Sequence, residues 1–182
     1  AHADAIALGP GLGQGDWGRA VLHLALDAGQ PLVLDADALN LLAQSPRELP
    51  GAILTPHPGE AARLLGIATG EVQRDRFSAA RAIADRYRAV VVLKGAGSIV
   101  AAPNETPRII GAGNPGMAVG GMGDVLTGVI AALRGQGLPA FDAASAGALL
   151  HSLASDVAAE GGERGLLPSD LMPHLRKLSN PA

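Results

Sequence analysis

Short apolar runs alternate with longer amphipathic segments along this chain, and this alternation restricts its fold more than any other feature. The apolar runs are residues 5–8, 32–34, 52–55 and 90–93. The last run, Val90-Val91-Val92-Leu93, is continuous and β-branched, as expected for a strand that is buried on both faces. Strands that alternate with helices usually form a mostly parallel sheet covered by helices. We therefore predict an α/β fold with three layers, α/β/α.

Two shorter strands, Ser98 to Ala101 and Arg108 to Ile110, flank a Pro103-Asn104 turn and predict a hairpin at one edge of the sheet.

The spacing of apolar residues also predicts the main helices. The helix from about Asp16 to Ala28 is expected to place Trp17 and Leu24 on its inner face. One continuous helix is expected from Glu71 to Tyr87, with its arginines in solvent: Arg74, Arg76, Arg81, Arg86 and the adjoining Arg88. A helix from Asp142 to Ala159 is expected to bury Leu149, Leu153 and, as a packing residue, His151.

Composition limits the class of protein. The 182 residues, 48% of them hydrophobic, suffice for a single domain with its own core. The net charge of −3 and the lack of a basic block argue against nucleic acid as a partner. The absence of cysteine argues against disulfides and thiol chemistry and is typical of a cytoplasmic protein. No apolar run approaches the roughly 20 residues that cross a bilayer, so no membrane association is expected.

The beginning of the sequence is abrupt. It starts at Ala1 without a methionine and enters the first apolar run almost at once. We therefore expect that the fold lacks an N-terminal portion here.

The stretch GNPGMAVGGMGDVLTGV, residues 113–129, carries the strongest functional signal. Five glycines precede Asp124, and an apolar segment with helical spacing follows. Glycines let a backbone approach a ligand closely, and the first turn of a helix has unpaired N–H groups that attract phosphate. A carboxylate at that position indicates a general base that deprotonates an attacking hydroxyl. The alternative is that Asp124 only caps the helix.

Three other loops also follow predicted strands. They are Gly9-Pro10-Gly11-Leu12-Gly13, Pro56-His57-Pro58 and Lys94-Gly95-Ala96-Gly97-Ser98. Their spacing matches neither the dinucleotide fingerprint nor the P-loop. The two prolines hold His57 in an extended turn, and Lys94 is suited to a nucleotide phosphate. Because ligands of open α/β sheets bind beyond the carboxyl ends of the strands, all four loops should converge on one crevice.

The acids after the second apolar run, Asp35 and Asp37, have two possible roles. They could bind a cation or cap the helix that follows, and capping is the interpretation we favour.

Taken in order, the motifs GPGLG, LDADALN, TPHPGEAARLLG, VVLKGAGS and GNPGMAVGGMGDVLTG resemble the ADP-dependent (S)-NAD(P)H-hydrate dehydratase family. The resemblance covers essentially the whole chain. It implies a ribokinase-like fold and a repair reaction, in which the S epimer of hydrated NADH or NADPH (NADHX, NADPHX) is dehydrated while ADP becomes AMP and phosphate. ATP is an alternative to ADP, and Mg²⁺ would bridge the phosphates.

The resemblance also implies roles for individual residues. Asp124 would be the catalytic base, and Gly121, Met122 and Gly123 would form an anion hole. The hydrate would contact Gly11, His57 and Asp124. The nucleotide would contact Lys94, Gly95, Ala96, Gly97, Ser98 and Gly123. No protein metal ligand is implied. Val119 departs from the family, which commonly has Thr or Ser there. The family tends to form tetramers and is often fused to an N-terminal epimerase.

Two other functions remain open from the residues alone. A ribokinase-like kinase for a sugar or vitamin would use the same glycine loop and acid, but it would leave TPHPGE unexplained. A non-catalytic fragment that binds a nucleotide without turning it over is the second alternative.

Overall fold

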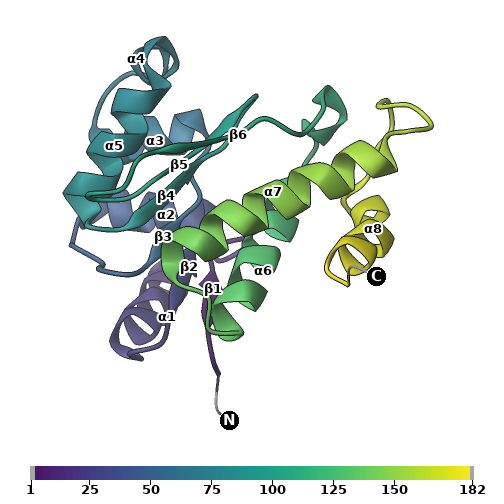
Figure 1. Ribbon diagram of the computed structural model, residues 1–182. Helices are drawn as coiled ribbons and strands as arrows, with labels where there is room; N and C mark the ends of the chain where they lie inside the picture. Colours follow the sequence, from purple (N-terminus) through teal and green to yellow (C-terminus); the bar gives the residue numbers. More distant parts are fainter. Residues whose placement is uncertain (1–2, 181–182) are drawn as a thin grey trace.

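A computed structural model describes residues 3–180, and it contains one six-stranded sheet (Figure 1). The strands lie side by side in sequence order: β1 (Ile6–Leu8), β2 (Leu32–Leu34), β3 (Ile53–Leu54), β4 (Val90–Leu93), β5 (Ser98–Ala101) and β6 (Arg108–Ile110). The first four strands are parallel, and β5 and β6 continue the sheet in antiparallel orientation. The mostly parallel sheet with an edge hairpin is therefore confirmed.

Helices cover both faces of the sheet, so the three-layer prediction is also correct (Figure 1). One face carries α1 (Asp16–Asp27), α2 (Ala36–Gln44), α3 (Pro58–Leu65), α4 (Thr69–Arg74) and α5 (Arg76–Tyr87). The other face carries α6 (Met122–Gly135) and α7 (Ala140–Ala158). The far end of α7 reaches past the sheet, and α8 (Leu171–Leu178) packs there, next to the 3-10 turn η2 (Pro168–Asp170).

Successive strand residues point to opposite faces, and this alternation produces two cores. Leu34, Leu54 and Val91 pack under α1–α5, whereas Val33 and Val92 pack under α6 and α7. A third, smaller cluster joins α8 to the helices α6 and α7. No helix among residues 3–180 is both long and apolar enough to cross a membrane.

Three expectations about the helices are wrong. The segment 71–87 is divided at Asp75, whose carboxylate accepts a hydrogen bond from the Ser78 amide and so begins α5 as a new helix. Trp17 and Leu24 are 68% and 73% exposed, because the buried side of α1 is formed by Gly18, Leu22 and Ala25 instead. Leu149 and Leu153 of α7 are exposed as well, because the small residues of this helix face the sheet.

Candidate active site

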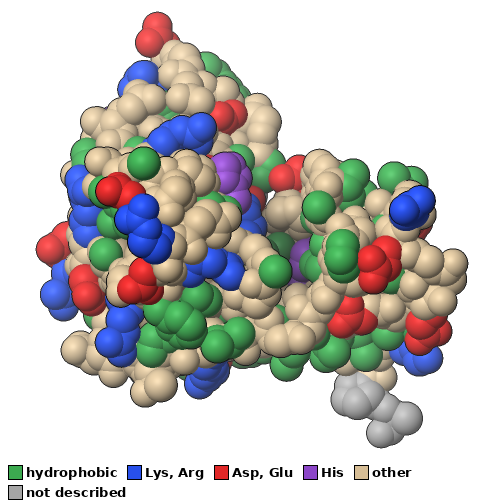
Figure 2. Space-filling model, turned by 90° about the horizontal axis from the view of Figure 1, so that it is seen from above, with side chains coloured by type: hydrophobic (Ala, Val, Ile, Leu, Met, Phe, Trp, Pro, Cys, Tyr) green, Lys and Arg blue, Asp and Glu red, His purple; other side chains and the backbone are tan. Residues whose placement is uncertain are grey.

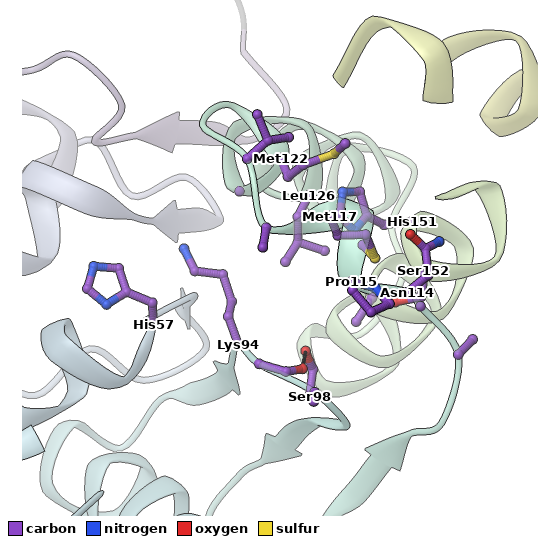
Figure 3. Close-up of a pocket in the computed structure, with 18 of the residues that line it drawn as sticks. His57, Lys94, Ser98, Asn114, Pro115, Met117, Met122, Leu126, His151 and Ser152 are labelled. Carbon is purple, nitrogen blue, oxygen red and sulfur yellow. Dashed lines mark hydrogen bonds between the residues drawn. The ribbon is translucent and has the colours of Figure 1, made fainter. Parts of the chain in front are cut away.

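A cavity of about 740 Å³ opens beyond the carboxyl end of β4. Its walls come from four places: His57, the turn 94–98, the loop 111–123 with the start of α6, and the inner face of α7 (Figure 3). In Figure 2 the surface is hollowed between the larger body and the smaller part that contains α8, and charged side chains lie along this hollow. Three of the four loops singled out in the sequence therefore meet at one cavity.

Lys94 lies at the centre of a buried polar network. Its ammonium is 2.7 Å from Oδ1 of Asp35 and 3.9 Å from Oε2 of Glu60. Asp35 is only 2% exposed, and its Oδ2 accepts a hydrogen bond of 2.9 Å from the Thr127 hydroxyl on α6. Asp35 thus neutralises Lys94 and does not cap α2 through its side chain, so the capping interpretation is wrong for this residue.

The Arg76 side chain supports the turn that begins at Lys94. Its guanidinium donates hydrogen bonds to the carbonyls of Leu93, at 3.2 Å, and Ala96, at 2.6 Å. Gly95 has a φ of +147°, which favours glycine, and a Cβ there would come within 2.9 Å of this guanidinium and displace it. Burial lowers the pKa of Arg76 from its ordinary value. The expectation that Arg76 faces solvent is therefore wrong.

His57 is the N-cap of α3, held outside the helix as its flanking prolines predict. Its Nδ1 accepts hydrogen bonds from the Gly59 and Glu60 amides, while the Glu60 carboxylate accepts one from the His57 amide. The Nδ1 atom is thus an acceptor, so the neutral ring carries its proton on Nε2. Nε2 lies 3.3 Å from Oε1 of Glu60, and the half-exposed ring can donate from it to a ligand.

The start of α6 forms one wall of the cavity. Gly121 is the N-cap with φ of +91°, and Gly121, Met122 and Gly123 all line the cavity. A Cβ on Gly123 would lie 3.2 Å from Nζ of Lys94, so the helix terminus and the ammonium are directly adjacent. Both favour an anion at this place.

Asp124 follows Gly123 as the third residue of α6 and is exposed. It is not the N-cap and makes no capping hydrogen bond, so it does not cap the helix through its side chain, although its charge lies in the first turn, at the positive end of the helix. Its side chain is not among the residues that line the cavity, which it adjoins only through Gly123.

The loop between β1 and α1 lies next to this network without lining the cavity. Gly9 packs directly against the backbone of Asp35. The Asp37 carboxylate accepts a hydrogen bond from the Gly13 amide, which lowers the Asp37 pKa. Gly11 lies between Gly9 and Gly13 in the sequence. It is exposed and has a φ of +67°. The fourth loop is therefore held at the same edge of the sheet, outside the cavity wall.

The α7 wall of the cavity contains His151, which is 4% exposed. Its Nε2 has no hydrogen-bond partner among the described residues. Burial lowers the pKa of His151 to about 4, against an opposing contribution from the backbone of Met122; the charge of Lys94 lowers it further. The ring is therefore neutral near pH 7 and, as expected, buried, but it also belongs to the cavity wall.

Within residues 3–180, no group of three or more His, Asp or Glu side chains could by itself hold a metal ion. The two buried carboxylates next to the cavity, Asp35 and Glu60, both face Lys94.

Comparison with known proteins identifies the family. The family model described as NAD(P)H-hydrate dehydratase matches residues 1–177. The chain belongs to the NAD(P)H-hydrate dehydratase family. It is 54% identical over 180 residues to the bifunctional NAD(P)H-hydrate repair enzyme Nnr of Coxiella burnetii, a match that covers 98% of this chain and 37% of that protein. It is 43% identical over 187 residues to the ADP-dependent (S)-NAD(P)H-hydrate dehydratase of Neisseria meningitidis, covering 98% of this chain and 63% of that protein.

A solved structure gives the same result for the fold. The ADP/ATP-dependent NAD(P)H-hydrate dehydratase from Bacillus subtilis, co-crystallized with ATP/Mg²⁺, superimposes with a TM-score of 0.85 at 33% identity. The match covers 95% of this chain and 62% of the Bacillus chain. The family and the ribokinase-like fold that the motifs implied are therefore confirmed. The chain spans about a third of the length of the bifunctional relatives.

Proposed function

We propose that this chain carries the ADP-dependent dehydration of the S epimer of hydrated NADH or NADPH, with AMP and phosphate as the other products. The observation that carries the proposal is the meeting of Lys94, its glycine turn and the start of α6 in one cavity. Membership of the dehydratase family supports it. So do the names of the relatives, which specify ADP dependence and the S epimer.

The proposed nucleotide site uses the positive groups of the cavity. The ammonium of Lys94 and the start of α6 lie next to each other at the same cavity, where both would stabilise the phosphates of ADP. The amides of the turn 95–98 add further donors. Gly121, Met122 and Gly123 would act as an anion hole for the transferred phosphoryl group.

The proposed chemistry consists of a phosphoryl transfer followed by an elimination. Asp124 takes the proton of the ring hydroxyl, and the hydroxyl oxygen bonds to the β-phosphorus of ADP while the bond to AMP breaks. The carbon–oxygen bond then breaks as the ring nitrogen supplies electrons, and phosphate leaves. Loss of a proton from the adjacent ring carbon completes the double bond. His57 donates a hydrogen bond to the hydrate through Nε2, and Gly11 contacts the hydrate from the β1–α1 loop.

Mg²⁺ would neutralise phosphate charge in this site. The chain offers no cage of three carboxylate or histidine ligands among its described residues, so the ion would be held mainly by phosphate oxygens and water. A Bacillus relative was co-crystallized with ATP/Mg²⁺. We also propose a homo-oligomer, a cytoplasmic location and, from the bifunctional relatives, an epimerase domain in the same polypeptide.

The decisive experiment mixes the chain with the S epimer of hydrated NADH, ADP and Mg²⁺. The proposed function predicts that the absorbance of reduced nicotinamide returns and that AMP and phosphate form in equal amounts. Replacement of ADP by ATP measures the nucleotide preference, and NADPH hydrate measures the cofactor preference. Accumulation of a phosphorylated product without reduced nicotinamide would instead identify a kinase, and nucleotide binding without any turnover would identify a binding fragment.

A further inference from the structure

The loop 111–118 supplies a large part of the cavity wall, and it is held by an acid on α7 that does not line the cavity. Oδ2 of Asp156 accepts a hydrogen bond of 2.9 Å from the Gly113 amide. Its Oδ1 accepts one of 3.0 Å from Nδ2 of Asn114. One carboxylate therefore fixes two consecutive residues of the loop.

Asn114 connects the Asp156 carboxylate to the rest of the loop. Its Nδ2 also donates to Oγ of Ser155, at 3.1 Å, and its Oδ1 accepts a hydrogen bond of 3.0 Å from the Gly116 amide. This last bond begins the 3-10 turn η1 (Pro115–Met117), which follows Asn114 directly. The orientation of the Asn114 amide is thus determined on both sides, and Asn114, Pro115 and Met117 all line the cavity (Figure 3).

Few other hydrogen bonds fix the backbone of this loop. Among the described residues, the hydrogen bonds that join positions 112–118 to another element all run to Ser155 and Asp156 of α7. Gly113, with φ of +107°, and Gly116 add conformational freedom that must be lost when a ligand binds. A loop ordered before binding avoids that cost.

We propose that Asp156 is a positioning residue for the nucleotide. Through Asn114 it holds residues 113–118 of the loop in the conformation that binds the nucleotide. The inference rests on the proposed function, because it assumes that the cavity binds ADP. Asp156 does not line the cavity, so its effect on the nucleotide is exerted through the loop.

The test exchanges the carboxylate and the amide between positions 156 and 114. In Asp156→Asn, two amide groups face each other and one hydrogen bond to a carboxylate is lost, so the dissociation constant for ADP should rise about tenfold. In Asn114→Asp, two carboxylates face each other and binding should also weaken. In the double variant the new amide at position 156 can accept from the Gly113 amide and donate to the new carboxylate at position 114, which restores the pairing.

The same change at position 156 should therefore have opposite effects in the two backgrounds. Asp156→Asn should weaken ADP binding by the wild-type chain and strengthen it in the Asn114→Asp chain, as measured by calorimetry. Amide exchange of residues 113–118 should rise and fall in parallel. Glu160→Gln removes an exposed acid just beyond the same helix and should leave ADP binding and exchange unchanged.

The outcomes separate the two proposals. A wild-type chain that does not bind ADP overturns the proposed function. If the wild-type chain binds ADP, and Asp156→Asn either has no effect or weakens binding equally in both backgrounds, the positioning role of Asp156 is overturned while the proposed function stands.

Discussion

Asp35 and Lys94, 59 positions apart in sequence, form an ion pair of 2.7 Å in which the carboxylate is almost fully buried. The Lys94 side chain remains 20% exposed, toward the cavity. A buried charge pair gives little net stability, but the loss of one partner leaves the other charge uncompensated. The pair therefore gives Lys94 a buried counter-ion beside the cavity where we propose that phosphates bind.

Asp35→Asn should reveal this role. We expect a loss of about 2 kcal/mol in the free energy of unfolding, because Lys94 loses its counter-ion but stays partly solvated. ADP should restore part of this loss, because its phosphates replace the carboxylate beside Lys94. The rise in melting temperature at saturating ADP should then be about 3 °C larger for the variant than for the wild type.

Asp37→Asn is the matched control, because Asp37 holds the Gly13 amide and does not contact Lys94. Its ADP-dependent rise in melting temperature should equal that of the wild type. Equal rises for Asp35→Asn and the wild type would contradict the proposed relation between Asp35, Lys94 and the phosphates.

Most of the sheet could be predicted because each apolar run is short, and the first three runs have glycine or proline directly before or after them. The orientation of α1 could not, because this helix has two apolar stripes. Its outer stripe contains Trp17 and Leu24, which are as apolar as the buried residues of the helix and at least as large. Gly18 is buried because it packs against the loop before α1, where a Cβ would lie 2.2 Å from the Gly13 carbonyl oxygen, and Ala25 is buried on the same side of the helix. Hydrophobic periodicity alone does not distinguish these two faces.

The motifs also predicted the main elements of the cavity, namely His57, the turn at Lys94 and the start of α6. The supporting residues could not be found in this way. Arg76 lies 17 positions from Leu93, whose carbonyl it binds, and Asp156 lies 43 positions from Gly113. Nothing local in the sequence distinguishes these two residues from solvent-exposed charges. Arg76 comes next to the turn at Lys94, and Asp156 next to Gly113, only when the chain is folded.

His57 caps α3, and we propose that it also contacts the hydrate; one pair of variants can separate these two roles. His57→Ala removes both the cap of α3 and the proposed contact with the hydrate, so it should cost about 1 kcal/mol of stability and weaken hydrate binding about tenfold. His57→Asn keeps a good N-cap, but its shorter side chain cannot reach the hydrate as Nε2 of histidine would. It should lose the same hydrate affinity with near wild-type stability, while ADP affinity changes little in both. Equal losses for hydrate and ADP would refute the placement of His57 at the hydrate.

His151 predicts how stability depends on pH. Its pKa of about 4 in the folded state lies below its ordinary value of 6.5, so only the unfolded chain takes up this proton between those values. Stability therefore falls as the pH drops from about 6.5 toward 4. Between pH 7 and pH 4.5, the wild type should lose about 2–3 kcal/mol more than His151→Gln, measured by urea unfolding. Parallel curves for the two chains would contradict a neutral, buried His151.

Asp124 provides the most direct test of the chemistry, because its exposed position allows replacement without damage to the fold. Asp124→Asn should lower turnover of the hydrate about a thousandfold through loss of the base, and should leave the dissociation constant for ADP nearly unchanged. Asp16→Asn replaces an exposed acid in the first turn of α1, and both turnover and affinity should survive it. An Asp124→Asn chain that keeps appreciable turnover would exclude Asp124 as the base, because an amide cannot accept the hydroxyl proton.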